Sequence, residues 1–275
     1  MRNLPWRAIR TIIWKDLRVV LRSPMVLLPM IVLPLLLQVL MPVGLGLGAL
    51  YAPESMNMET DLVTFLDKVP ASVMQEFQGL PFNVVMMVLM LEYLFAPLYL
   101  LVPMMVASVI AADSFVGERE RKTLEALLHT PLSDTELLLS KMLTAWIAAN
   151  VVSVASFLLY SIAVNAVGFG PMGGLFFPNT LWLVLVFWVT PAVAGLGLAS
   201  TVLLSSRVNT FQEAYQAGGV IVVPIVGLLF AQIAGVIFLS PLFALILGLV
   251  VWLIDAGLLW LGRAAFRRED LLARL

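Results

Sequence analysis

Two acidic residues of this sequence stand inside long apolar runs, where carboxylates are rare. Glu92 follows the start of an apolar run near Asn83, and Asp255 lies toward the end of the last apolar run. An ionisable side chain at the centre of a bilayer costs roughly 2.5–3.5 kcal/mol on insertion scales, so such groups usually have a function or a partner. Glu92 is predicted near mid-depth, where it either lines a translocation path and attracts cations or is a protonated or hydrogen-bonded packing residue. For Asp255 a structural role is favoured, because it can reach Arg263 or the membrane surface.

The residues needed for nucleotide, metal or thiol chemistry are missing from the sequence. A phosphate-binding loop needs a glycine before its lysine, but Arg121 precedes the Lys122–Thr123 pair. His129 is the single histidine and stands outside any HExxH motif, so it is predicted to be a solvent-facing turn residue. The absence of cysteine excludes disulfides and thiolate ligands. We therefore expect no catalytic residue, no metal site and no cofactor in this chain. The net charge of -1 carries no signature of nucleic-acid binding.

The most ordered polar segment is GERERKTLEALLHTPLSDTELLLSK, from Gly117 to Lys141. It contains opposite charges four residues apart and a stripe of leucines, which favour a helix. The charge pairs are Glu118 with Lys122 and Arg121 with Glu125, and the stripe is Leu124, Leu127 and Leu128. Pro131 ends this helix, and Ser133 with Glu136 predicts a capping box that starts the next one. A helix, a tight corner and a second helix are predicted, and such a rigid corner can transmit force.

With the preceding ADSFV, this segment resembles the cytoplasmic signature of type-2 ATP-binding-cassette (ABC) exporter permeases, most closely the sodium-efflux branch. The residues that fit are Asp113, Gly117, Glu118, Thr123, Leu124, Glu125, Leu127, Leu128, Thr130, Pro131, Ser133 and Lys141. The resemblance implies an export permease that pairs with a second permease subunit, expected to be an identical copy. It also implies two separate ATPase subunits, which bind ATP and Mg and dock on this segment. The implied docking residues are Gly117, Glu118, Thr123, Leu124, Glu125, Leu127, Leu128 and Pro131. The polar loop 51–82 is short for the sodium-efflux branch, and the cargo is not identified.

The composition dictates the setting in which these residues lie. Of 275 residues, 61% are hydrophobic and only 12% are charged, whereas soluble domains have roughly 45–50% apolar and 25% charged residues. Apolar runs of about 20 residues match the hydrocarbon core of a bilayer, where the backbone must be helical. The sequence thus predicts a single all-α transmembrane permease domain over 1–275 with about six transmembrane helices. The predicted spans are 25–50, 83–112, 142–167, 180–204, 217–239 and 242–261. Only Ser240 and Pro241 separate the last two, so one of them is a candidate re-entrant segment.

Residues 5–22 are predicted to form an interfacial helix on the membrane surface. Apolar and polar side chains fall on opposite sides of this segment at helical spacing. The apolar side comprises Trp6, Ile9, Ile13, Leu17 and Val20, and the polar side comprises Arg7, Thr11, Lys15, Arg18 and Arg22.

The distribution of basic residues predicts the orientation in the membrane. In the six-helix arrangement, all of the 16 lysines and arginines except Lys68 fall on one side, and such residues are retained in the cytoplasm. Both termini and the segment 113–141 are therefore predicted to be cytoplasmic, and the acidic loop 51–82 faces outward. The expected location is the cell (inner) membrane of a prokaryote.

Another class of protein competes with the exporter permease. A secondary transporter or channel would work without an ATPase, but it usually has an internal repeat or more intramembrane charges. Neither feature is evident in the sequence. An importer-type ABC permease would need a second alanine and a glycine after Glu125, and His129 to Pro131 do not supply them.

Overall fold

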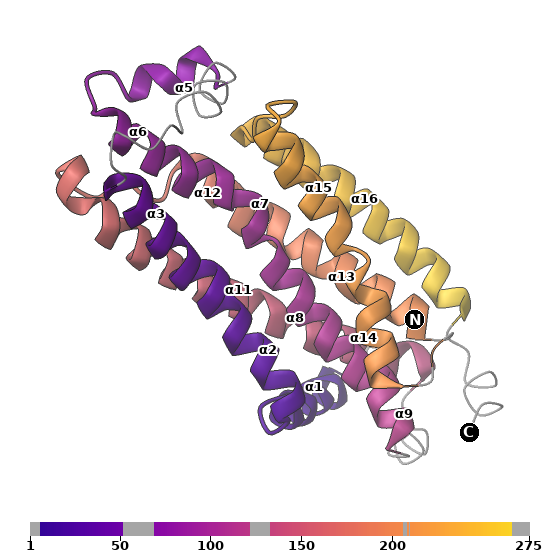
Figure 1. Cartoon of the computed structure of the whole chain (residues 1–275). Coiled ribbons are helices and arrows are strands. Elements are labelled where there is room, and N and C mark those ends of the chain that lie inside the picture. The colour runs from indigo at the N-terminus through magenta and orange to yellow at the C-terminus, as the bar shows by residue number, and fades with distance from the viewer. Residues whose placement is uncertain (1–5, 52–68, 122–132, 206–207, 209, 266–275) are drawn as a thin grey trace.

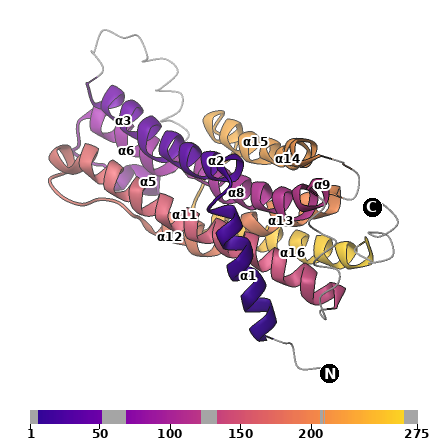
Figure 2. The same ribbon diagram turned by 90° about the horizontal axis from the view of Figure 1, so that it is seen from below.

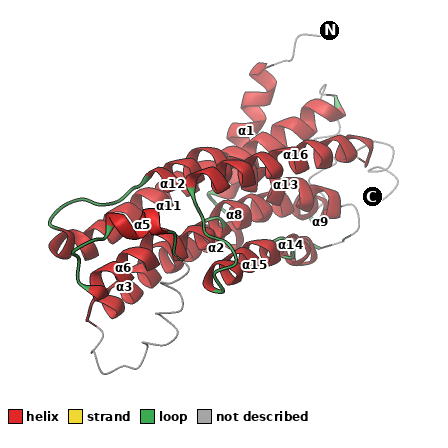
Figure 3. Cartoon of the chain, turned by 90° about the horizontal axis from the view of Figure 1, so that it is seen from above, coloured by secondary structure: helices red, strands yellow, loops and turns green. Residues whose placement is uncertain are grey.

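The computed structural model describes residues 6–51, 69–121, 133–205, 208 and 210–265. Every regular element within these residues is a helix, and the long helices run along one another as a bundle (Figures 1 and 3). Five of the described helices are long and apolar enough to cross a membrane. Because the bilayer interior offers the backbone no water, helices that satisfy their own hydrogen bonds are the expected architecture. The chain is an all-α integral membrane protein, as its composition predicts.

The spans are assembled from helical pieces that join end to end, with single π-helical turns, labelled η, between some of them. The first span consists of α2 (Pro24–Leu35), η1 (Leu36–Leu40) and α3 (Met41–Tyr51). The second consists of α6 (Phe82–Leu89), η2 (Met90–Leu94), α7 (Phe95–Tyr99), α8 (Leu101–Ala112), η3 (Asp113–Gly117) and α9 (Glu118–Glu120). The third is α11 (Asp134–Met172), the fourth is α12 (Thr180–Val184), η4 (Leu185–Val189) and α13 (Thr190–Ser205), and the last is α16 (Pro241–Ala265).

The predicted fifth span, 217–239, is not one long helix. It divides into α14 (Phe211–Gly219) and α15 (Val222–Ile233), and a 12-residue helix such as α15 extends only about 18 Å. The break follows from the sequence, because Gly218 and Gly219 are poor helix formers and Pro224 has no N–H to bond back to residue 220. The described residues thus contain five long spans and one broken segment, where six spans were predicted.

The second span forms the centre of the bundle. In its apolar window 83% of the residues are buried, against 28% in the first span and 22% in the last. The helices α11 and α13 pack against α8, while α14 and α15 cover α8 and α7. Apolar side chains therefore surround this span and fill the middle of the bundle.

The helix α1 (Trp6–Val20) crosses one end of the bundle at a steep angle to the spans and packs on α11 (Figure 2). We call this end the α1 end, and the opposite end, which carries α5 (Ala71–Glu76), the α5 end (Figure 1). The buried face of α1 differs in part from the predicted one, because Trp6 is 67% exposed. Buried positions on α1 are Ile9, Ile12, Asp16 and Val20.

Candidate functional site

The predicted docking segment is only partly within the described residues. Gly117 and Glu118 are described, and both are buried at the α1 end of the central span. The other predicted docking residues lie outside the described residues, so their role stays a prediction; they are Thr123, Leu124, Glu125, Leu127, Leu128 and Pro131. His129 also lies outside them.

A buried ion pair holds the two ends of this segment together. The ammonium group of Lys141 donates a hydrogen bond to Glu118 Oε2 and another, 2.8 Å long, to the backbone oxygen of Ser114. Lys141 is 1% exposed and Glu118 is 8% exposed. Since 23 residues separate the pair in sequence, this contact joins the end of the central span directly to the start of α11.

The helix α1 joins the same cluster of charges through Lys15. Lys15 Nζ lies 2.8 Å from Asp16 Oδ1 and 3.6 Å from Glu118 Oε1. Partial burial lowers the pKa of Lys15, but the adjacent Asp16 and Glu118 carboxylates outweigh this effect and raise the pKa above its ordinary value of 10.5. We call Lys15, Asp16, Glu118 and Lys141 the charge cluster.

A second ion pair braces the last turn of the central span. Arg121 Nη1 lies 2.9 Å from Asp113 Oδ1, and the two side chains pass over Gly117. A Cβ atom at position 117 would lie 2.9 Å from that Asp113 oxygen and 3.3 Å from the Arg121 guanidinium, so a glycine is needed for this close approach. Glu125, the partner that helical spacing predicted for Arg121, lies outside the described residues.

Two further contacts tie α9 to the start of α14. The Arg119 guanidinium donates a hydrogen bond to the backbone oxygen of Val208. The Glu120 carboxylate accepts one of 3.0 Å from the backbone N–H of Phe211. Side chains at the described start of the docking segment therefore contact α1 and α11 and the residues at the start of α14.

The far end of the segment follows the prediction closely. The side chain of Ser133 accepts a hydrogen bond from the Glu136 N–H, and the Glu136 carboxylate accepts one from the Ser133 N–H. This capping box begins α11, which continues without a break to Met172. The polar stretch from Asp134 to Lys141 thus forms the first turns of the third span.

Glu92 belongs to a separate polar cluster near the α5 end. Its Oε2 atom accepts a hydrogen bond of 3.0 Å from the Asn179 side chain, and its backbone oxygen accepts one of 2.7 Å from the Trp182 indole. Asn179 caps the start of α12, so Glu92 lies level with the beginning of the fourth span. It is 6% exposed and faces other helices of the same chain. Its position at mid-depth in the membrane stays a prediction.

The Glu92 cluster is built around the π-helical turn η2. A π turn displaces backbone carbonyls from their usual partners, and in an apolar interior those groups need other donors. Tyr160 donates to the oxygen of Leu91, and Gln232 donates to that of Tyr93 over 2.9 Å. Tyr160 also stacks on Trp182 with ring centroids 4.5 Å apart. The sequence favours an interhelical hydrogen bond for Gln232, and the bond to the Tyr93 oxygen confirms it, but only a tertiary structure reveals which carbonyls a π turn frees.

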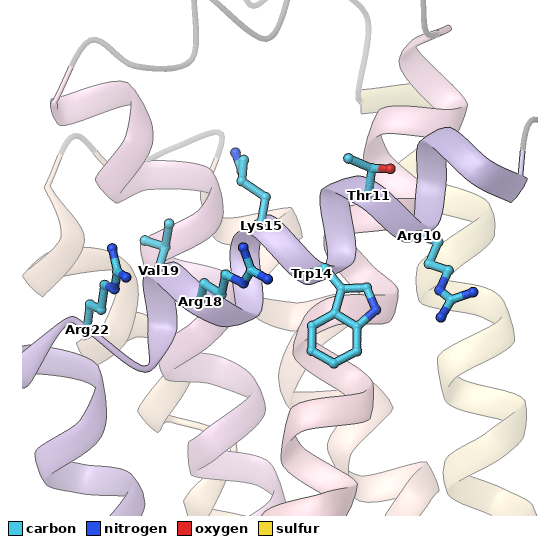
Figure 4. Close-up of a pocket in the computed structure, with 7 residues that line it drawn as sticks. All are labelled: Arg10, Thr11, Trp14, Lys15, Arg18, Val19 and Arg22. Atoms are coloured by element: carbon cyan, nitrogen blue, oxygen red, sulfur yellow. The ribbon is translucent and has the colours of Figure 1, made fainter.

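The exposed face of α1 carries a basic surface around a tryptophan. Figure 4 shows the Trp14 ring pointing along the spans, while Lys15 points away from them. The residues of this surface are Arg10, Thr11, Trp14, Lys15, Arg18, Val19 and Arg22. An amphipathic helix with indole and arginine side chains on its outer face is typical of the membrane interface, where arginine meets lipid phosphates.

These features define a polytopic helical membrane protein in which buried charges join the end of the second span, the start of the third and the helix α1. The family model "ABC-2 family transporter protein" matches residues 10–252, and the chain belongs to that family. The protein is accordingly a permease component of an ABC transporter, a transmembrane subunit that associates with an ABC ATPase. No curated protein and no solved structure matches the chain.

Proposed function

We propose that this chain is the membrane subunit of an ATP-driven exporter, in which separate ATPase subunits dock on the segment 113–141. In this proposal the α1 end and both termini face the cytoplasm, and ATP and Mg bind only to the ATPase subunits. The sodium-efflux branch remains the nearest resemblance of the segment. Family membership does not name the cargo, because one fold carries many substrates.

The charge cluster is the observation that carries this proposal. A partner that pushes on a docking segment can move the membrane helices only if the segment is firmly attached to them. The buried Glu118–Lys141 pair attaches it to the second and third spans at once, and Lys15 extends the attachment to α1. Buried interactions of this kind resist displacement far better than exposed ion pairs, which contribute about 0–1 kcal/mol.

The filled centre of the bundle supports pairing with a second permease subunit. The central span is 83% buried in its apolar window, and close-packed interiors leave few voids larger than a water molecule. A path through one copy would require the central span to separate from its neighbours. A path between two copies requires only a rocking motion of whole bundles, so we propose a homodimer with the path at its interface.

An autonomous secondary transporter or channel remains the competing function, and ATP hydrolysis distinguishes the two. The tagged permease is purified from membranes of its native host, and ATPase activity is measured in the eluate. The exporter proposal expects an ABC ATPase to co-purify and to hydrolyse ATP in the complex. Export of a cargo by the permease reconstituted alone, without ATP, would overturn it.

Leu127→Asp tests the docking surface itself. A leucine that a partner buries contributes roughly 1.5–3 kcal/mol, so a charge there should abolish ATPase co-purification while the permease still folds. Gln75→Asp adds the same charge to an exposed residue at the α5 end and serves as the control. Lost thermal stability in Leu127→Asp with the ATPase retained would mean that the leucines pack on the permease itself.

A further inference from the structure

A cavity of about 270 Å³ lies between α11, α13 and α16, toward the α1 end of the bundle. Its walls are almost entirely apolar, and Asp255 is the one charged residue among them. The apolar lining includes Leu138, Met142, Trp146, Leu198, Val202 and Trp252. Leu139 and Leu259 also line it and are 37% and 41% exposed, so the cavity reaches the outer surface of the bundle.

Asp255 is buried in this wall without a polar partner among the described residues, and the side chain of Arg263, its predicted partner, lies outside them. It is 3% exposed, and neither of its carboxylate oxygens accepts a hydrogen bond within the described part of the chain. Gly195 of α13 lies directly against it, since a Cβ atom there would be 2.5 Å from Asp255 Oδ2. The glycine makes room for the carboxylate, but its own backbone gives the carboxylate no hydrogen bond. The indole N–H of Trp252, on the same wall, also has no partner among the described residues.

The other buried carboxylates among the described residues each have a charged or polar partner. Asp16 pairs with Lys15 and Asp113 with Arg121. Glu118 meets the ammonium group of Lys141, and Glu92 accepts a hydrogen bond from Asn179. A carboxylate without such a partner is costly in an apolar setting and is neutralised by a proton or by a cation. Asp255 differs from these carboxylates because its side chain lines an open cavity.

We propose that this cavity binds an amphipathic amine, with the apolar body of the ligand among the leucines and its ammonium group at Asp255. The ammonium–carboxylate contact forms a charge-assisted hydrogen bond in a setting that excludes water, which is where such bonds are strongest. The apolar walls supply the rest of the affinity in proportion to the ligand surface that they cover.

The size of the cavity limits the ligand. Sites for drug-sized molecules occupy about 300–1,000 Å³, so 270 Å³ suits a small lipophilic amine or the head of a larger amphiphile. The exposed rim belongs to α11 and α16 and is apolar, so we expect a ligand to enter from the lipid. Small lipophilic amines and the ethanolamine headgroup of a phospholipid present the same ammonium chemistry.

The binding test uses the purified permease in an uncharged maltoside detergent, without an ATPase. 4-Phenylbutylamine is the probe, and 4-phenylbutanol is the uncharged molecule of matched shape. Binding is measured by equilibrium dialysis at the same detergent concentration for every variant. We expect the amine to bind at least about tenfold more tightly than the alcohol, which corresponds to one charge-assisted hydrogen bond.

Asp255→Asn keeps the shape of the side chain and should abolish this preference while the alcohol still binds. Asp255→Leu, an apolar replacement suited to a span, provides the same comparison if the first variant fails to fold. Glu76→Gln removes a negative charge from an exposed residue at the α5 end and should keep the preference. Equal binding of amine and alcohol to the unmodified protein, or a preference that survives in Asp255→Asn, would overturn the proposal.

A competition experiment identifies the source of the ammonium group. Dihexanoyl-phosphatidylethanolamine and dihexanoyl-phosphatidylglycerol are each added against bound 4-phenylbutylamine. Displacement by the ethanolamine lipid alone assigns the cavity to a lipid headgroup, and amine binding that neither lipid displaces assigns it to small amines. Because the assay needs neither ATP nor transport, a negative result leaves the exporter proposal intact.

Discussion

Glu118→Gln should destabilise the permease strongly, although it changes only a few atoms. The substitution removes the counter-charge of Lys141, which is 1% exposed and keeps two uncharged described partners, the backbone oxygen of Ser114 and the ring of Phe115. Removal of one member of a buried ion pair costs roughly 3–5 kcal/mol, because the remaining charge stays buried and uncompensated. For a chain of this size, 1 kcal/mol lowers the unfolding midpoint by about 2–4 °C, so we expect a decrease of roughly 6–20 °C.

Arg18→Met is the control on the neighbouring helix α1. Arg18 is exposed and belongs to the basic surface of α1, and an exposed charge pair contributes about 0–1 kcal/mol. We expect its unfolding midpoint to decrease by no more than about 4 °C. Thermal unfolding of the purified permease in detergent, followed by tryptophan fluorescence, measures all of these variants.

A double-mutant cycle then isolates the interaction between the two buried charges. In Glu118→Gln combined with Lys141→Met no charge of the pair remains, so the combined loss of stability should be smaller than the sum of the single losses. The expected difference is about 0.5–3 kcal/mol for residues in direct contact. Strictly additive losses, or a Glu118→Gln variant as stable as the Arg18→Met control, would refute the account of a buried clamp.

Three further predictions concern orientation, the Glu92 cluster and the surface of α1. A cysteine placed at Ser55 should react with a membrane-impermeant thiol reagent in whole cells and one at Ser133 should not; the reverse pattern would invert the orientation. Glu92→Gln should leave folding intact, since an amide can still bond Asn179, but it should change substrate-stimulated ATPase activity. Unchanged activity across pH would make Glu92 a packing residue. Trp14→Ala should weaken binding of detergent-solubilised permease to anionic vesicles, because its 54% exposed indole is lost from the basic surface; equal flotation with the vesicles would argue against this role.

Features that depend on local chemistry could be read from the sequence. The long spans follow from apolar runs of sufficient length, and α11 begins where Ser133 and Glu136 form the predicted capping box. The interfacial helix α1 and the family of the chain are also evident from local patterns. In each case, the residues that form the sequence pattern are close together in the chain and also make the interaction that the pattern predicts.

The broken fifth segment shows where hydropathy alone misleads, although the short Ser240–Pro241 connection already marked one of the last two segments as a candidate re-entrant one. Its apolar run is long enough for a span, yet two glycines and Pro224 divide it into α14 and α15. Hydropathy measures the preference of a segment for lipid, whereas a continuous helix also requires an unbroken ladder of backbone hydrogen bonds. The length and hydropathy of this segment predict that it enters lipid, but they do not predict whether its helix is continuous.

Tertiary structure alone decided the partners of the buried charges. Helical spacing suggested Lys122 for Glu118, and Lys122 lies outside the described residues; the fold adds Lys141 from 23 residues away and Lys15 from α1. Glu92 meets Asn179 across 87 residues, while Asp255 faces a cavity and meets no described partner. The apolar pattern of a sequence determines which segments enter the membrane, because transfer into lipid is a property of each segment. The pairing of charges depends on which helix faces come together, and that is a property of the packed bundle as a whole.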